Sequence, residues 1–413
     1  MNNLKEQKHY ELNKKKELID LLERRLNFNK NNNNNNRWKI IGNKLKYNYR
    51  TVSLSGFSGT TTEYIFDKWG IDTYWNYNED KYPIINYKSK NPNIWVKFIV
   101  DRLCEAYQPV FRIPLNAIYW LADNKGLYTN INYEPFIIDN NDEEMFSFSG
   151  QIYHGLIDDL ILYIQEEVMS RTGKDCVIIL DLHWNDQFDK PEPVNQEIKQ
   201  ESSLNDFWYS VANRYKNNTN VWFEPSLGKD KNDRHVIDGK GQYVGMKQLY
   251  DIIRNEVKAD NIILISGGYG GYAYYNNGFD ISWFKHIESL HLKNIMFNLH
   301  PIQSIDSTMV DKSVDNFKQL IQMLNKVSIP LIVTDVGLSN NPGNYTEQIV
   351  SFCYDNNISW IAWSVKPNNE MSLLYPNIMT MKNGRIGITQ GMENKDLSIK
   401  IGVNWEDIWN KYS

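Results

Sequence analysis

From Trp38 onward, short apolar runs rich in branched residues alternate with longer segments of helical periodicity. Strand-like runs separated by amphipathic helices are typical of βα units, which build a parallel sheet. The runs number eight, which is the number that closes a (β/α)8 barrel. They cover residues 52–56, 110–114, 176–182, 220–224, 261–266, 294–299, 330–334 and 358–364.

Amphipathic patterns with the helical period lie between these runs. They cover residues 156–169, 204–215, 245–257, 314–327 and 346–355. A doubly wound open sheet is the rival architecture, and a dinucleotide-binding sheet of that kind carries a glycine-rich phosphate fingerprint after its first strand. Neither Ser55-Gly56-Phe57-Ser58-Gly59 nor Gly267-Gly268-Tyr269-Gly270-Gly271 has the G-x-G-x-x-G spacing. The pattern therefore favours an α/β fold of the (β/α)8 TIM barrel type.

The chain before the barrel divides into two parts. Residues 1–36 carry leucines at helical spacing among charged residues, and then an asparagine run, residues 31–36, that cannot bury apolar surface. We expect a short charged helix on an Asn-rich tether, acting either as a solvated tail or as a docking helix for a protein partner. Alternating residues on both sides of Gly42-Asn43 predict a hairpin at the barrel entrance. The predicted domains are thus 1–36, the helix and tether, and 37–413, the barrel.

Composition narrows the class of protein. The 45 basic and 50 acidic side chains leave a formal charge of −5, which argues against a dedicated nucleic-acid binder. No apolar run approaches the ~18 residues of a membrane span, and the start of the chain is too charged for a secretory signal. A cytoplasmic location is therefore expected by default, with non-classical export or packaging left open. The three cysteines are widely spaced and are interpreted as reduced core residues, so no disulfide, cofactor or metal is expected.

Polar and aromatic side chains stand at or just after the carboxyl ends of the predicted strands. Active sites of (β/α)8 barrels lie at that face, because the loops that follow the strands meet there. Carboxyl groups, imidazoles, a guanidinium and tryptophans around one rim suit a sugar, whose apolar faces stack on Trp and whose hydroxyls take polar partners. The residues of this rim are Arg112, Asp181, His183, Glu224, His300, Asp335, Trp360 and Trp363.

The strings around these residues resemble one known family. They are Val110-Phe111-Arg112-Ile113-Pro114, Ile178-Ile179-Leu180-Asp181-Leu182-His183, Val221-Trp222-Phe223-Glu224, Ile263-Leu264-Ile265-Ser266-Gly267-Gly268, Asn298-Leu299-His300, Pro330-Leu331-Ile332-Val333-Thr334-Asp335-Val336-Gly337 and Ser359-Trp360-Ile361-Ala362-Trp363-Ser364. In order and spacing they are similar to glycoside hydrolase family five, the cellulase family of clan A. The resemblance implies a barrel of retaining β-glycanases that hydrolyse β-glucan or cellulose-type substrates. It also implies one glutamate after strand four as general acid/base and one after strand seven as nucleophile.

Strand four departs from the family's Asn-Glu-Pro motif. Without a gap, Val221-Trp222-Phe223-Glu224-Pro225 continues to Leu227-Gly228-Lys229, which places Gly228 at the acid/base position and removes the carboxyl group. With a gap, Glu224-Pro225 is the family's Glu-Pro, and the proline ends the strand at Glu224. The gap displaces the acid by four residues, or about 13 Å along a strand. The sequence leaves both registers open.

Strand seven also departs from the family pattern. The family's Thr-Glu-Phe-Gly is replaced by Thr334-Asp335-Val336-Gly337, so the nucleophile position carries the shorter Asp335. Retaining chemistry places its two carboxyl groups ~5 Å apart, and a retracted nucleophile costs orders of magnitude in rate. The tyrosine that the family has two residues after its histidine is Ile302 in this chain, where the histidine is His300. The positions tied to bond cleavage have therefore changed together.

The resemblance assigns the candidate site residues. Asp335 is the candidate nucleophile and Glu224 the candidate acid/base, the latter in the gapped register. The candidate substrate-binding residues are Arg112, His183, His300 and Trp363. A metal site built from His183, His300 and Asp335 has no ligand spacing behind it, so none is expected.

Two functional hypotheses follow from these departures. The first is a retaining glycoside hydrolase, similar to endo-β-glycanases, whose altered catalytic pair leaves its activity weak or absent. The second is a catalytically inactive pseudo-glycosidase that binds glycan or has a structural role. Both hypotheses take a β-linked oligo- or polysaccharide as the partner.

Overall fold

A computed structural model provides the structure of the protein and describes twelve segments of it. These are residues 37–59, 94–121, 150–184, 201–225, 237–239, 244–266, 282–301, 310–336, 345–365, 379–382, 385–388 and 405–413. The predicted tail, residues 1–36, lies outside them.

Eight parallel strands form a closed barrel in which each strand pairs with its neighbours in chain order and the last, β11, pairs with the first, β4. The strands are β4 (Ser55–Gly59), β5 (Pro109–Asn116), β6 (Val177–Trp184), β7 (Val221–Glu224), β8 (Ile263–Ser266), β9 (Ile295–Leu299), β10 (Leu331–Val336) and β11 (Ser359–Val365). The predicted TIM barrel is confirmed, and the open-sheet alternative is excluded.

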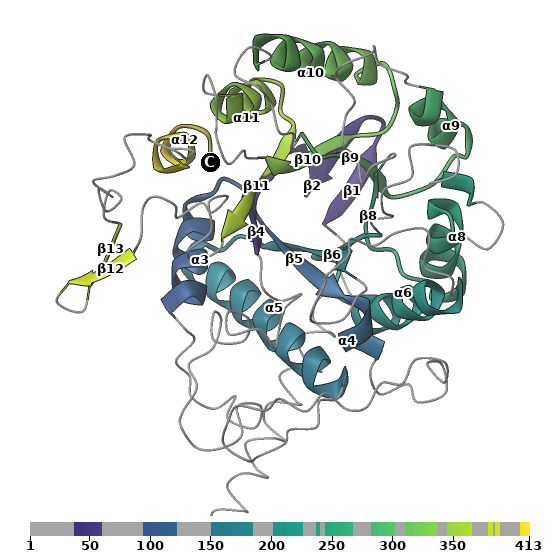
Figure 1. The fold of residues 1–413 in the computed structure, drawn as a ribbon, viewed down its shortest axis with the longest axis horizontal. Helices are drawn as coiled ribbons and strands as arrows, with labels where there is room; N and C mark the ends of the chain where they lie inside the picture. Colours follow the sequence, from purple (N-terminus) through teal and green to yellow (C-terminus); the bar gives the residue numbers. More distant parts are fainter. Residues whose placement is uncertain are drawn as a thin grey trace, which may run out of the picture.

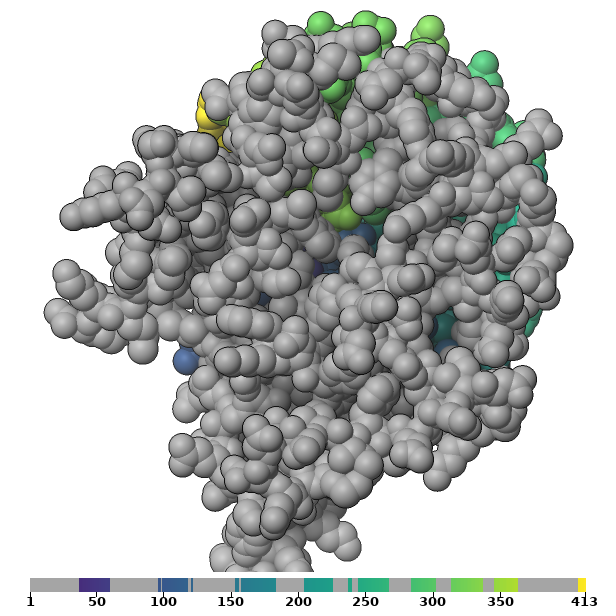
Figure 2. Space-filling model, in the orientation of Figure 1, coloured from purple at the N-terminus to yellow at the C-terminus, as the bar shows by residue number. Residues whose placement is uncertain are grey.

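Helices surround the strands as a ring (Figure 1). They are α3 (Ile94–Glu105), α4 (Ala117–Leu121), α5 (Gly150–Thr172), α6 (Glu201–Tyr215), α8 (Met246–Asp251), the π-helix η3 (Ile252–Glu256), α9 (Ser282–Ser289), α10 (Val310–Leu324), α11 (Tyr345–Asp355) and α12 (Trp405–Tyr412). In the space-filling view of the same orientation, green atoms in the colour of α10 are visible at the upper edge and yellow atoms in the colour of α12 at the upper left (Figure 2). None of the helices described is both long and apolar enough to span a membrane.

The barrel strands are buried on both faces. Val110 and Phe111 are neighbours on β5, yet one belongs to the apolar cluster inside the barrel and the other to the cluster between strands and helices. This separation follows from the period-two alternation of side chains along a strand. Toward the carboxyl ends the inward positions become polar, since Val110 is followed by Arg112 and Met296 by Asn298. The polar layer therefore lies on top of an apolar barrel interior.

A small antiparallel sheet closes the opposite, N-terminal end of the barrel. It contains β1 (Trp38–Ile41), β2 (Lys44–Tyr47) and β3 (Arg50–Thr51), so the predicted hairpin is confirmed and gains a third strand. The indole of Trp38 lies perpendicular to that of Trp222, with ring centroids 5.3 Å apart. Trp38 therefore packs against the apolar interior of the barrel from the end opposite the polar layer.

The last helix of the ring, α12, packs over the seam where β11 meets β4. The Trp409 ring lies 4.3 Å from the Phe57 ring and 5.9 Å from the Trp360 ring, measured between centroids. The Trp409 indole Nε1 also donates a hydrogen bond of 3.0 Å to Glu105 at the end of α3. Trp360 thus points outward into this contact. A further hairpin, β12 (Met379–Lys382) with β13 (Arg385–Ile388), lies between β11 and α12 in the sequence.

Three details differ from the sequence prediction. The first barrel strand begins at Ser55 and not at residue 52, and the Val52 amide donates instead to the Leu45 carbonyl of β2. The predicted helix 245–257 changes at Ile252 from α8 into the π-helix η3. The cysteines are free as expected, but Cys104 is only partly buried.

Candidate active site

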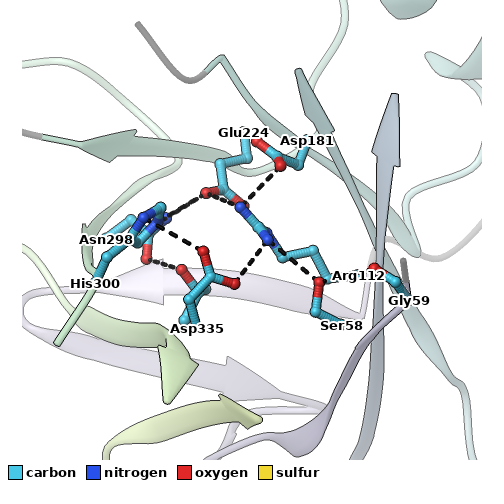
Figure 3. A network of polar contacts seen from close by, with 9 residues as sticks. Ser58, Gly59, Arg112, Asp181, Glu224, Asn298, His300 and Asp335 are labelled. Carbon is cyan, nitrogen blue, oxygen red and sulfur yellow. Dashed lines mark hydrogen bonds and ion pairs between the residues drawn. The ribbon is translucent and has the colours of Figure 1, made fainter. Parts of the chain in front are cut away.

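Arg112 is the centre of the polar layer. It projects from β5, its side chain has no exposed surface, and its guanidinium contacts three carboxyl groups (Figure 3). Nε and Nη2 donate to the two oxygens of Glu224 at 2.6 and 3.0 Å. Nη2 also lies 2.8 Å from Asp181, and Nη1 donates to Asp335 at 2.8 Å and to Ser58 at 3.2 Å. One planar fork therefore ties together side chains from five strands.

The strand register explains why these side chains meet. Ser58 on β4 pairs with Arg112 on β5, and Asp181 on β6 pairs with Glu224 on β7. Side chains of residues paired in parallel strands point to the same face of the sheet. All four side chains therefore face into the barrel near the carboxyl ends of the strands.

Glu224 is held as an anion. Burial alone would raise the pKa of this carboxyl group, but the charge of Arg112 and hydrogen bonds from His300 and Arg112 outweigh burial and lower the pKa to about 2. For Arg112, burial opposes the charge, whereas Asp181, Asp335 and Glu224 raise its pKa well above the ordinary value. Buried charges are stable when they are paired and hydrogen-bonded, which is the arrangement observed.

A second polar chain approaches Glu224 from the neighbouring strands. The Thr334 hydroxyl donates to Oδ1 of the Asn298 side chain at 2.8 Å, and Nδ2 of the same side chain donates to Glu224 Oε1 at 2.6 Å. The His300 imidazole has Nε2 3.1 Å from Glu224 Oε1 and Nδ1 3.4 Å from Asp335 Oδ2. The imidazole and the guanidinium of Arg112 thus both bridge the two candidate catalytic carboxyl groups.

Asp335 reaches this layer through an irregularity in β10. Between Val333 and Val336 the register of β10 against β11 shifts, so three steps along β10 match two along β11. Asp335 has a φ of +57°, in the left-handed region that Asp and Asn tolerate better than most other residues. Bulges of this kind redirect a side chain. As a result, the adjacent residues Thr334 and Asp335 both contact the inward polar layer.

The structure brings four of the sequence-predicted site residues together: Arg112, Glu224, His300 and Asp335. For two others it describes the backbone alone: His183 lies near the end of β6, and Trp363 lies on β11 and pairs with Ser58. Gly228, the acid/base position of the ungapped register, lies outside the described residues. Strand β7 ends at Glu224, directly before Pro225.

Sequence reasoning did not assign a site role to Ser58, Asn298 or Thr334. A signal existed for Asn298, which is a polar residue inside an apolar run, two positions before His300 and therefore on the same face. Ser58 fell beyond the predicted end of its strand. Thr334 follows the inward-facing Ile332 by two positions, so regular alternation places it on the inward face. The bulge then brings the adjacent Asp335 to the same layer.

The described residues form no group of three or more His, Cys, Asp or Glu side chains arranged to hold a metal ion. The carboxyl groups of the polar layer are instead occupied by the Arg112 guanidinium, the Asn298 amide and the His300 ring. What the arrangement can offer a ligand is therefore hydrogen bonding and charge.

A closed barrel with a polar layer at the carboxyl ends of its strands places the chain among (β/α)8-barrel proteins of the kind that carry active sites at that face. The family model described as Cellulase (glycosyl hydrolase family 5) matches residues 143–369, more than half of the chain. The chain therefore belongs to glycosyl hydrolase family 5.

Individual relatives are more distant. Cellulase CelDZ1 from Thermoanaerobacterium sp is 21% identical over 276 residues, which cover 61% of this chain and 67% of that protein. The structure of XacCel5A in complex with cellopentaose is similar at 14% identity and a TM-score of 0.47, covering 78% of this chain and 96% of that one. A β-mannanase from Streptomyces thermolilacinus, solved with mannohexaose, has 10% identity and a TM-score of 0.46, covering 81% and 87%.

Proposed function

We propose that this chain is a glycan-binding member of family 5 that hydrolyses β-linked glycans very slowly or not at all. The observation that carries the proposal is the state of Glu224. Both of its oxygens accept hydrogen bonds from Arg112, and its side chain has no exposed surface. The carboxyl group at the end of β7 is therefore occupied by contacts within the barrel.

A general acid must carry a proton at the working pH and reach the leaving oxygen. Glu224 has a pKa of about 2, so near neutral pH it is ionised, and its burial keeps it from a bound sugar. General acid catalysis contributes about 10²- to 10⁴-fold in rate. Without another acid, the leaving group of a glycoside departs unprotonated and that factor is lost.

The space between the candidate carboxyl groups is a second argument. Retaining glycosidases hold their two carboxyl groups about 5 Å apart with the scissile bond between them. Here Arg112 and His300 each contact both Glu224 and Asp335. Protein side chains therefore connect the two groups.

These contacts favour the ungapped register for β7, the fourth strand of the barrel. Glu224 is paired with Asp181 across β6 and β7 and bonded to Arg112, as expected of a residue that holds the barrel together. In that register Gly228 occupies the acid/base position, and glycine has no side chain that could donate a proton.

The ligand we propose is a β-linked oligo- or polysaccharide. Membership of a cellulase family and the likeness to a protein named a cellulase support this class of ligand. His183 and Trp363 stand near the carboxyl ends of β6 and β11, on the rim where sugar-contacting residues are expected. Trp363 would supply an aromatic face for a sugar ring.

The test is to measure binding and turnover on the same protein. Titration calorimetry with cello- and manno-oligosaccharides should detect binding, while a reducing-sugar assay on soluble β-glucans should detect little or no hydrolysis. Turnover that Glu224→Gln abolishes would establish the alternative, a retaining hydrolase with Glu224 as its acid. Absence of both binding and turnover would overturn the glycan-binding proposal.

A further inference from the structure

Asn298 is the residue of the polar layer with the shortest contact to Glu224 outside Arg112. Its side chain is fully buried on β9, and its Nδ2 lies 2.6 Å from Glu224 Oε1 and 2.9 Å from His300 Nε2. Its Oδ1 accepts the Thr334 hydroxyl at 2.8 Å. Both ends of the amide are therefore engaged, Nδ2 by Glu224 and His300 and Oδ1 by Thr334.

The amide can satisfy its neighbours in one orientation. With Nδ2 toward Glu224, the amide donates to a carboxylate, which accepts hydrogen bonds and offers none when it is ionised. With the amide reversed, its oxygen would face that carboxylate at the same short distance, and two acceptors would repel each other. The Thr334 hydroxyl reinforces the observed orientation, because it donates to Oδ1.

We propose that Asn298 is a positioning residue: held by Thr334, it fastens the Glu224 carboxylate to Arg112 and His300 and withholds it from a bound glycan. This inference rests on the proposed function, since it names the contact that keeps Glu224 out of proton transfer. It assigns a role to a side chain whose described contacts are to Glu224, His300 and Thr334.

The contact has a measurable electrostatic consequence. A hydrogen bond donated to a carboxylate favours its ionised form, so removing the donor raises the pKa. In Asn298→Leu the donor is lost while the side-chain volume stays similar. In Thr334→Val the hydroxyl that orients the amide is lost with little change in shape, and Thr334→Ser keeps that hydroxyl as the matched control.

The experiment is infrared titration of carboxyl protonation in the folded protein, with the Glu224 band assigned by its absence from Glu224→Gln. We expect the pKa of Glu224 to rise by about one pH unit or more in Asn298→Leu. A smaller rise is expected in Thr334→Val and none in Thr334→Ser. An unchanged Glu224 titration in Asn298→Leu, with a lowered unfolding midpoint, would show a merely structural residue and overturn the inference.

If Asn298→Leu does not fold, the comparison of Thr334→Val with Thr334→Ser tests the proposed role of Asn298. Equal Glu224 titrations in Thr334→Val and Thr334→Ser would then contradict the proposed role. The readout does not depend on turnover or on glycan binding. Hydrolysis by the unmodified protein would therefore sink the proposed function and leave the titration result standing, and the two failures can be told apart.

Discussion

Arg112 and Glu224 form a side-on pair in which both nitrogen donors of one guanidinium edge reach both carboxylate oxygens, at 2.6 and 3.0 Å. Neither side chain has exposed surface, and the pair joins β5 to β7 across β6. The same guanidinium binds Asp181 and Asp335. Three buried carboxyl groups therefore depend on one cation among the described residues.

Removal of that cation should destabilise the fold strongly. Arg112→Met keeps the length of the side chain but leaves Glu224 and Asp181 without their guanidinium. Breaking a buried ion pair from one side costs about 3–5 kcal/mol. We expect a loss of that size in the free energy of unfolding, measured by urea denaturation at neutral pH. Arg112→Lys keeps the charge but not the planar fork of the guanidinium. Its free energy of unfolding should lie between those of the natural protein and Arg112→Met.

The matched control is an exposed pair between arginine and aspartate. Arg171 lies 2.7 Å from Asp101, and both side chains are about half exposed. Arg171→Gln should change the free energy of unfolding by less than about 1 kcal/mol. Equal losses in Arg112→Met and Arg171→Gln would contradict the central role of Arg112.

Stability should fall in acid because of Glu224. Its pKa is lowered to about 2 in the folded protein, below the ordinary value of 4.5. A lowered folded-state pKa means that the stabilisation is fully present above pH ~4.5 and is lost as the pH falls toward ~2. The difference corresponds to a contribution on the order of 3 kcal/mol. Urea titrations between about pH 5 and pH 2 should show a steeper loss in the natural protein than in Glu224→Gln, and parallel curves would argue against the lowered pKa.

Trp363 and Trp360 should respond differently to truncation, although they lie on β11 three residues apart. Trp360 is buried against Trp409, so Trp360→Ala should lose about 3–5 kcal/mol of unfolding free energy. Trp363→Ala should instead weaken the binding of cello-oligosaccharides and leave the fold intact. Calorimetric titration together with circular dichroism separates these results, and unfolding of Trp363→Ala would identify Trp363 as a core residue.

Asp335→Glu alone should not create hydrolytic activity. The position has left-handed backbone geometry, and its carboxyl group is bonded to Arg112. In the ungapped register the missing acid is at Gly228, so Gly228→Glu combined with Asp335→Glu is the smallest change expected to restore measurable turnover of β-glucan. Strong activity in Asp335→Glu by itself would show that an acid already operates in the natural chain.

The strands were predictable because short, continuous apolar runs rich in branched residues define them with little help from tertiary contacts. Seven of the eight barrel strands begin within two residues of their predicted starts. The exception, β4, begins at Ser55, because an apolar Val52 reads as strand whether it enters the barrel or, as here, pairs with the small sheet. Local pattern cannot distinguish those two pairings.

The polar layer was predictable in part of its membership and not in its bonding. The carboxyl ends of the strands pointed to Arg112, Glu224, His300 and Asp335, and these residues meet. That Glu224 lies within the barrel wall depends on the stagger between strands, which no local pattern contains. The inward direction of the Asp335 side chain depends on a bulge between β10 and β11, which is also a property of the tertiary structure.

The bond between Arg112 and Asp335 joins positions 223 residues apart, and the one between Trp409 and Glu105 joins positions 304 apart. Contacts of such long sequence separation form late, after most of the loop-closure entropy has been lost. The polar layer is thus complete only in the closed barrel, in which β11 pairs with β4 and α12 packs over both. A ligand that binds the complete polar layer and not the unfolded chain therefore stabilises the whole barrel. At ligand concentrations well above the Kd, the gain in the free energy of unfolding grows with the logarithm of the ligand concentration.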